Sequence, residues 1–279
     1  MISSIETGDR RSSTGGVLDR HTIPGARTAI GTAYALLFSA CILPFLSIDT
    51  LAWLGEEDGP VENAGALCFL LAGILFFSTA HKTARLHRQW GAGHSVTPLV
   101  LYALGALLLV CFGEEISWGQ RLFHYPVPGW VEAINQQGEW NLHNLTWFQA
   151  HTVEGVKKSF WARLIDMNRL LAIFQLTVCT LVPAFTAYPA TCRAWVMRIG
   201  LPVFPWWIAG LVPVHLLVSQ TLYAIIGGGG DPILGDVLDE TKETMRAFIF
   251  LVVAMWAYGR ATATASTAAG TRPPDAVGP

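Results

Sequence analysis

The sequence predicts an all-α, polytopic membrane protein built as a bundle of about six transmembrane helices. Of the 279 residues, 52% are hydrophobic and only 14% are charged, whereas an ordinary soluble domain carries about 25% charged residues. The apolar residues fall in stretches of about 20, the length that spans a hydrocarbon core of roughly 30 Å. The net charge of −2 gives no basic field for nucleic acid. The expected partner is the lipid bilayer.

Six stretches reach spanning length. They are residues 28–48, 60–80, 97–118, 168–188, 203–226 and 238–258. The third reaches this length only by including Glu114 and Glu115, and the sixth only by extending back through charged residues. Residues 28–258 therefore form the predicted transmembrane domain. A polar segment, residues 1–27, precedes it, and residues 259–279 follow as a tail whose Ala, Thr, Gly and Pro predict disorder.

The distribution of Lys and Arg predicts the orientation, because cytoplasmic loops carry an excess of both. Eleven of the 18 lie in the N-terminal segment, the loops after spans two and four, and the C-terminal tail. The short loops 49–59 and 227–236 hold none. Both termini are therefore predicted to be cytoplasmic. Sixteen of the 20 Asp and Glu residues lie on the opposite side, and this bias suggests a site on the periplasmic face.

The long loop between spans three and four, residues 119–167, contains Trp130, Trp140, Trp147 and Trp161. Indole rings favour the headgroup layer of a membrane. We therefore expect this loop to form a periplasmic lid of short interfacial helices over the bundle.

The first acidic cluster, Glu56-Glu57-Asp58-Gly59-Pro60-Val61-Glu62, lies at the start of the second span. Pro60 suits the first position of a helix, and Glu62 can reach back to cap its start. The functional alternative is that a carboxylate of this cluster faces the bundle centre.

The second cluster is Gly113-Glu114-Glu115-Ile116-Ser117-Trp118-Gly119-Gln120-Arg121. A charge within a span is costly. On a continued helix, Glu114, Trp118 and Arg121 share one face and Glu115 projects about 100° away. One glutamate is then free to form a structural pair with Arg121 while the other is catalytic or binds an ion.

The third cluster, Asn141-Leu142-His143-Asn144, lies in the lid. An imidazole here is a ligand, a proton carrier or a structural residue held by hydrogen bonds.

The fourth cluster lies in the last span. Asp236, Glu240 and Glu243 share a helical face, and Glu243 is spaced to pair with Arg246 at i, i+3.

One ionisable residue, His215, falls near the middle of the fifth span. An ionisable group at that depth is a functional candidate, and a neutral histidine bonded across helices is the alternative.

The motifs Glu-Asp-Gly-Pro-Val-Glu (57–62), Gly-Glu-Glu-Ile-Ser-Trp-Gly-Gln-Arg (113–121) and Asn-Leu-His-Asn (141–144) occur in this order. With this spacing the chain resembles a group of uncharacterised bacterial multi-pass membrane proteins over roughly residues 30–260. The resemblance implies a bacterial inner-membrane protein. It implies no activity and no functional residues.

Known site motifs are absent from the sequence. It has no His-Glu-x-x-His, no pair of histidines at i, i+4, no phosphate-binding loop and no dinucleotide-binding glycine pattern.

These clusters predict a polar pocket at the periplasmic end. The leading hypothesis is a hydrolase or transferase acting on a lipid or lipid-linked substrate. Glu115 is its general base or metal ligand, His143 its proton carrier or second ligand, and Arg121 the partner of an anionic headgroup. A divalent metal is a possible cofactor in this hypothesis. The catalytic candidates are Glu114, Glu115, His143 and Arg121. The substrate-binding candidates are Gln120, Asn141, Asn144, Glu62, Glu240, Glu243 and Arg246.

Two alternatives come from other classes of protein. A proton- or cation-coupled transporter would use His215 as a relay, but few polar residues lie in the inner half of the spans. A non-catalytic membrane scaffold would use the same clusters as a buried polar network.

Overall fold

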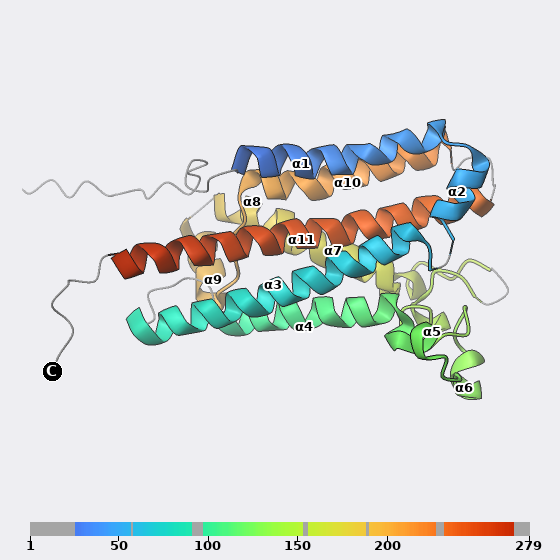
Figure 1. Cartoon of the computed structure of the whole chain (residues 1–279), viewed down its shortest axis with the longest axis horizontal. Coiled ribbons are helices and arrows are strands. Elements are labelled where there is room, and N and C mark those ends of the chain that lie inside the picture. The colour runs from blue at the N-terminus through green and yellow to red at the C-terminus, as the bar shows by residue number, and fades with distance from the viewer. Residues whose placement is uncertain are drawn as a thin grey trace, which may run out of the picture.

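The computed structural model describes residues 26–56, 58–90, 97–152, 156–187, 190–226 and 232–270. Its main helices are α1 (Ala26–Ser39), α2 (Ile48–Leu54), α3 (Pro60–Trp90), α4 (Pro98–Glu115), α7 (Met167–Leu176), α8 (Val182–Ala187), α9 (Ala190–Ile199), α10 (Trp206–Ile225) and α11 (Pro232–Gly270). The long helices run side by side in one bundle (Figure 1). The all-α prediction is confirmed.

Six helical segments of the described residues are long and apolar enough to cross a membrane. They are Thr28–Phe45, Pro60–Arg88, Pro98–Glu115, Met167–Ala187, Trp206–Ile225 and Ile233–Ser266. This confirms the predicted number of spans, and the protein is an integral multi-pass membrane protein. The fourth is assembled from α7, a π-helical turn (Thr177–Leu181) and α8.

Two helix ends differ from the sequence prediction. The third span ends at Glu115 rather than near residue 118, because Ser117, Trp118 and Gly119 adopt left-handed backbone conformations. The proposed continued helix, with Glu114, Trp118 and Arg121 on one face, therefore does not form.

The last helix also runs further than predicted, as far as Gly270. This overturns the prediction of disorder for residues 259–270. Alanine, frequent in this stretch, has the highest helix propensity. The rest of the predicted tail, like the N-terminal segment through residue 25, lies outside the described residues.

Helix α3 lies between α4 and α11 and packs along both (Figure 1). It approaches α4 closely at two glycines: a Cβ on Gly73 would lie 3.2 Å from the Gly105 carbonyl oxygen, and a Cβ on Gly105 would lie 3.2 Å from that of Gly73. Small residues allow this close helix contact in membranes. The start of α3 meets α11 in the same way, because a Cβ on Gly65 would lie 2.9 Å from Thr244 Oγ1. These contacts fix the end of α4 relative to α11.

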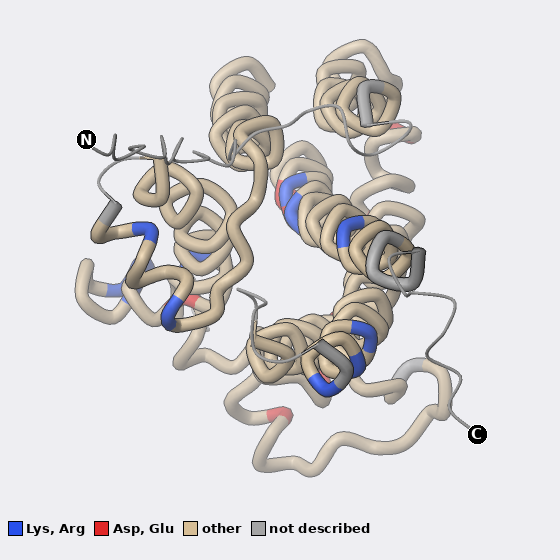
Figure 2. Tube along the Cα trace, turned by 90° about the vertical axis from the view of Figure 1, so that its left-hand side faces the viewer, with Lys and Arg blue, Asp and Glu red and all other residues tan. Residues whose placement is uncertain are grey.

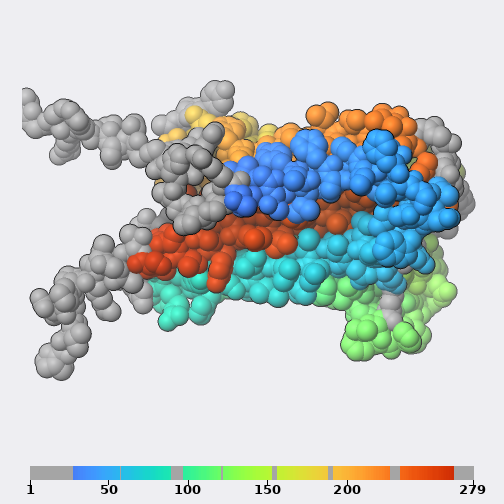
Figure 3. Space-filling model, turned by 45° about the horizontal axis from the view of Figure 1, so that its top comes forward, coloured from blue at the N-terminus to red at the C-terminus, as the bar shows by residue number. Residues whose placement is uncertain are grey.

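The segment between α4 and α7, hereafter the lid, sits at one end of the bundle (Figures 1 and 3). Its regular parts are short: α5 (Gln120–Phe123), α6 (Gly129–Glu132) and two 3-10 turns (Thr146–Phe148 and Ala162–Ile165). Trp130, Trp147 and Trp161 are exposed. Lys and Arg residues in the last part of α3 and in α9 lie at the end of the bundle opposite the lid, which faces the viewer in Figure 2.

Candidate functional site

The end of α4 folds back on itself. A Cβ on Gly113 would lie 2.9 Å from the ring of Trp118, so the glycine leaves room for the indole to lie against the helix. Gly119, at φ +83°, completes the reversal in a conformation that glycine adopts without strain. From this position Trp118 Nε1 donates a hydrogen bond to Glu114 Oε1 at 2.7 Å. This hydrogen bond from Trp118 therefore fixes the orientation of the Glu114 carboxylate at the end of α4.

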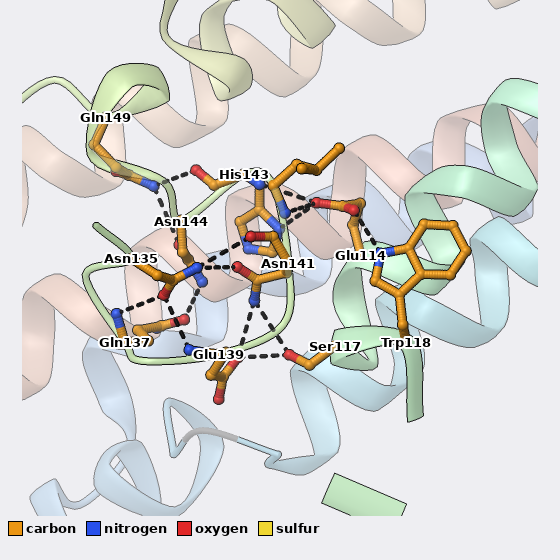
Figure 4. Close-up of polar contacts among 11 residues, drawn as sticks. Glu114, Ser117, Trp118, Asn135, Gln137, Glu139, Asn141, His143, Asn144 and Gln149 are labelled. Atoms are coloured by element: carbon orange, nitrogen blue, oxygen red, sulfur yellow. Dashed lines mark hydrogen bonds and ion pairs between the residues drawn. The ribbon is translucent and has the colours of Figure 1, made fainter. Parts of the chain in front are cut away.

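The carboxylate of Glu114 holds the lid. Its Oε2 accepts hydrogen bonds from the backbone N–H groups of Leu142 (2.6 Å) and His143 (2.9 Å). The same oxygen lies 3.5 Å from Nδ1 of His143. Figure 4 shows these contacts converging on Glu114 from the lid and from Trp118. The sequence analysis predicted Glu114 as a catalytic residue. In the structure its carboxylate anchors the backbone of the lid to the end of α4.

A second network joins α4 to the lid beside the first. Ser117 Oγ donates to Glu139 Oε2 at 2.6 Å, and Asn141 Nδ2 donates to both Ser117 Oγ (3.1 Å) and Glu139 Oε2 (2.9 Å). Asn135 Nδ2 in turn donates to the side chain and the backbone carbonyl of Asn141. All four of these side chains are buried. A buried network with its groups satisfied rigidifies the structure around it.

The other amides of the lid serve the same purpose (Figure 4). Asn144 Nδ2 donates to Gln137, and Gln149 Nε2 donates to Asn144 Oδ1 at 3.1 Å. Gln120 Oε1 accepts from the backbone N–H of Trp140 at 2.6 Å. The predicted substrate-binding residues Gln120, Asn141 and Asn144 are therefore occupied with holding the lid together. The side chain of Arg121, and Glu57, lie outside the described residues.

Glu115 differs from its neighbour. Its carboxylate is partly buried, and within the described parts of the chain it receives no side-chain or backbone hydrogen bond. Its charge interacts with those of Glu243, His143, Glu62 and Arg246. The charge of Glu240 interacts with those of the same carboxylates. The structure therefore brings the predicted residues of α3, α4, α11 and the lid to one region.

Of these carboxylates, Glu62 also has a local role. Its Oε2 accepts from the backbone N–H of Asp58 at 2.6 Å, and α3 begins at Pro60. The capping interpretation of this cluster is confirmed.

The predicted pairing of Glu243 with Arg246 is indirect. Asn168, at the start of α7, donates from Nδ2 to Glu243 Oε1 at 2.6 Å and accepts from Arg246 Nη1 at Oδ1, at 2.9 Å. The backbone carbonyl of Arg246 accepts from Gln175 Nε2 at 2.9 Å. Sequence reasoning missed Asn168 and Gln175. Their signal was available, since both are amides in a predominantly apolar span, but nothing in the sequence says which helix they face.

The environment of His143 favours its charged form. Burial lowers the pKa of His143, but the hydrogen bond to Glu114 and the negative charges of Glu115 and Glu243 raise it more. The pKa therefore lies above its ordinary value of 6.5. A histidine whose charged form is favoured in this way is suited to accept a proton and pass it on.

His215 is buried at 1% exposure on α10, and its Nδ1 lies 3.4 Å from Ser219 Oγ. This contact runs along the helix rather than across helices. Among the described residues, no group of three His, Cys, Asp or Glu side chains is arranged to hold a metal ion. Glu115 and His143, the predicted metal ligands, thus have no third protein ligand of these types in the part of the chain that is described.

No family model matches the chain, and comparison with curated proteins and with solved structures gives no match either.

Proposed function

We propose that this protein is a membrane-embedded hydrolase or transferase that acts on a lipid or lipid-linked substrate. The single observation that carries the proposal is the contrast between adjacent carboxylates. Glu114 is committed to the lid, whereas Glu115, among the described residues, has no hydrogen-bond partner and lies within the electrostatic influence of His143. A partly buried carboxylate beside an imidazole is suited to general acid–base chemistry.

In this proposal Glu115 is the general base and His143 the proton carrier. Glu114 is a positioning residue, because it fixes both the backbone and the Nδ1 side of His143. A carboxylate on one ring nitrogen orients an imidazole and stabilises its protonated form. Glu240 and Glu243 complete the polar surroundings of the substrate.

The depth of the site supports a lipid substrate. The α4 span has 18 residues and ends at Glu115, and a helix of this length covers about 27 Å, close to the hydrocarbon thickness. Glu115 therefore lies at headgroup level. The lid's exposed tryptophans suit the same layer.

The proposed location is a bacterial inner membrane, with the lid on the periplasmic side and both termini in the cytoplasm. The support for this orientation is the Lys and Arg residues in the last part of α3 and in α9, at the end opposite the lid, because short cytoplasmic loops carry an excess of both.

The test uses purified full-length protein in liposomes of total bacterial polar lipid extract, with products followed by lipid mass spectrometry. We expect wild type to convert one lipid class, and Glu115→Gln and His143→Gln to lower the rate about 100-fold or more. Glu132→Gln, an exposed acid on α6, is the matched control and keeps the rate. Unchanged lipids with wild type, or equal rates with Glu115→Gln, would contradict the proposal.

The scaffold alternative is favoured by one observation, the satisfied network of Ser117, Glu139 and Asn141. It predicts no lipid conversion and full tolerance of Glu115→Gln, so the same experiment decides between the two.

A further inference from the structure

Arg246 is the most deeply buried charged side chain near Glu115 among the described residues, with 4% of its surface exposed. It lies on α11 within the segment Ile233–Ser266. An arginine buried at this depth is normally paired with a carboxylate or with several acceptors.

Within the described ranges, the guanidinium of Arg246 has a single hydrogen-bond partner. Its Nη1 donates to Asn168 Oδ1 at 2.9 Å. No other hydrogen bond or ion pair of this side chain occurs among the described residues. A guanidinium has five N–H donors, so most of them have no acceptor in the part of the chain that the structure describes. Glu115 interacts with Arg246 as a nearby charge, and Glu243 is joined to Arg246 through the side chain of Asn168.

The position of Arg246 is nevertheless fixed. Asn168 is oriented by its own bond to Glu243 (2.6 Å), so its carbonyl oxygen is directed to accept from Arg246. Gln175, which lies in the same span as Asn168, donates a hydrogen bond to the backbone carbonyl of Arg246. The structure therefore holds a preorganised cation, most of whose donors have no acceptor among the described residues, in the region of the proposed general base.

We infer that Arg246 binds an anionic oxygen of the substrate headgroup, a phosphodiester or a carboxylate. The planar fork of arginine matches both groups in bidentate geometry. The nearby charges of Glu115 and Glu243 oppose a dianion, which favours a singly charged group over a phosphate monoester. This inference rests on the proposed function, because it takes the ligand to be the lipid that Glu115 acts on.

The test measures binding of single-chain lipids to full-length protein in a neutral detergent by native mass spectrometry. The probes are lysophosphatidylglycerol for the phosphodiester, laurate for the carboxylate and monolaurin as the uncharged control. We expect one anionic probe to bind at least tenfold more tightly than monolaurin. Which probe does so identifies the headgroup.

The decisive variant is Arg246→Lys, which keeps the charge but loses the fork. We expect it to weaken the anionic probe about tenfold, the loss of a charge-assisted hydrogen bond, and to leave monolaurin unchanged. Arg85→Gln, an exposed arginine on α3, is the matched control and should bind as wild type does. Equal binding of the three probes, or of wild type and Arg246→Lys, would overturn the inference.

The result separates the inference from the proposed function. Loss of anion selectivity in Arg246→Lys, together with normal turnover in Glu115→Gln, would support the binding site and reject the general base. The reverse pattern would support the enzyme and reject Arg246 as its anchor.

Discussion

The lid and the face formed by α3, α4 and α11 meet at the same end of the bundle. They differ in how completely their polar side chains are hydrogen-bonded. In the lid, Asn135 and Asn141 each make two or more hydrogen bonds, and the backbone N–H groups of Leu142 and His143 both bond to Glu114 at the end of α4. On the helical face, Glu115 makes none among the described residues, and Arg246 makes one through its side chain. A buried polar group left without a partner costs free energy. The polar groups of the lid therefore stabilise its fold, whereas those of the helical face are suited to bind a ligand.

The largest expected effect comes from removing the carboxylate that joins the two regions. Glu114→Ala deletes the acceptor of the Leu142 and His143 N–H groups, and hydrogen bonds to a charged group contribute about 1.5–3 kcal/mol. We expect amide exchange of residues 139–146 to accelerate about tenfold or more, measured by hydrogen–deuterium exchange. Glu115→Ala is the matched control and should leave the lid protected. Equal acceleration in both variants would erase the distinction between the two regions.

A smaller effect is expected within the second network. Asn141→Ala removes the donor to Ser117 and Glu139 and the acceptor of Asn135. We expect it to destabilise the lid by about 1–3 kcal/mol, seen as a lower thermal midpoint of lid tryptophan fluorescence. Gln136→Ala, on an exposed residue of the same loop, should have little effect. An unchanged midpoint in Asn141→Ala would show that this network is not what rigidifies the lid.

The contact between Gly113 and Trp118 should be weaker still. In Gly113→Ala the new methyl group would lie 2.9 Å from the indole, and the half-exposed ring can swing away. The cost is at most the one bond from Trp118 to the Glu114 carboxylate, about 1.5–3 kcal/mol for a bond to a charged group, and water at the half-exposed ring replaces part of it. The measurement is the emission maximum of Trp118, which should shift to longer wavelength in a variant whose other tryptophans are replaced by phenylalanine. A wavelength equal to that of the Gly113 parent would contradict the folded-back geometry.

The smallest effect should come from pH. The pKa of His143 is raised in the folded protein, so the stability that its charge contributes is complete below 6.5 and is lost as pH rises through the raised pKa. The effect is limited because both backbone bonds to Glu114 persist when the imidazole is neutral. Thermal midpoints of wild type should fall across this window relative to those of His143→Gln. Parallel pH profiles would show that the imidazole contact does not stabilise the lid.

Much of the fold could be predicted because hydropathy and length are local properties. Six spans follow from apolar stretches of the right length, and the cap formed by Glu62 follows from helix-start chemistry. The end of α4 could not be predicted in this way. A continued helix and a reversal at Ser117 are equally compatible with the local pattern, and packing of Trp118 on Gly113 selects the reversal.

The sequence could name residues of the candidate site but could not assign a different role to each of them. Nothing in the sequence distinguishes Glu114 from Glu115, since both are glutamates at one span end. The difference arises because only one of them meets the lid's backbone N–H groups, which are 28 and 29 residues away along the chain. Asn168 was missed for the same reason, as its two partners lie 75 and 78 residues away.

The sequence by itself therefore determined the class of protein, the number of spans and the scarcity of charge, because the membrane imposes these through each segment separately. The tertiary structure decided which charged side chains are hydrogen-bonded and which, among the described residues, have donors or acceptors without a protein partner. That decision depends on the close approach of α3 to α4 and α11 and on the docking of the lid, and both bring together groups that are distant in the chain.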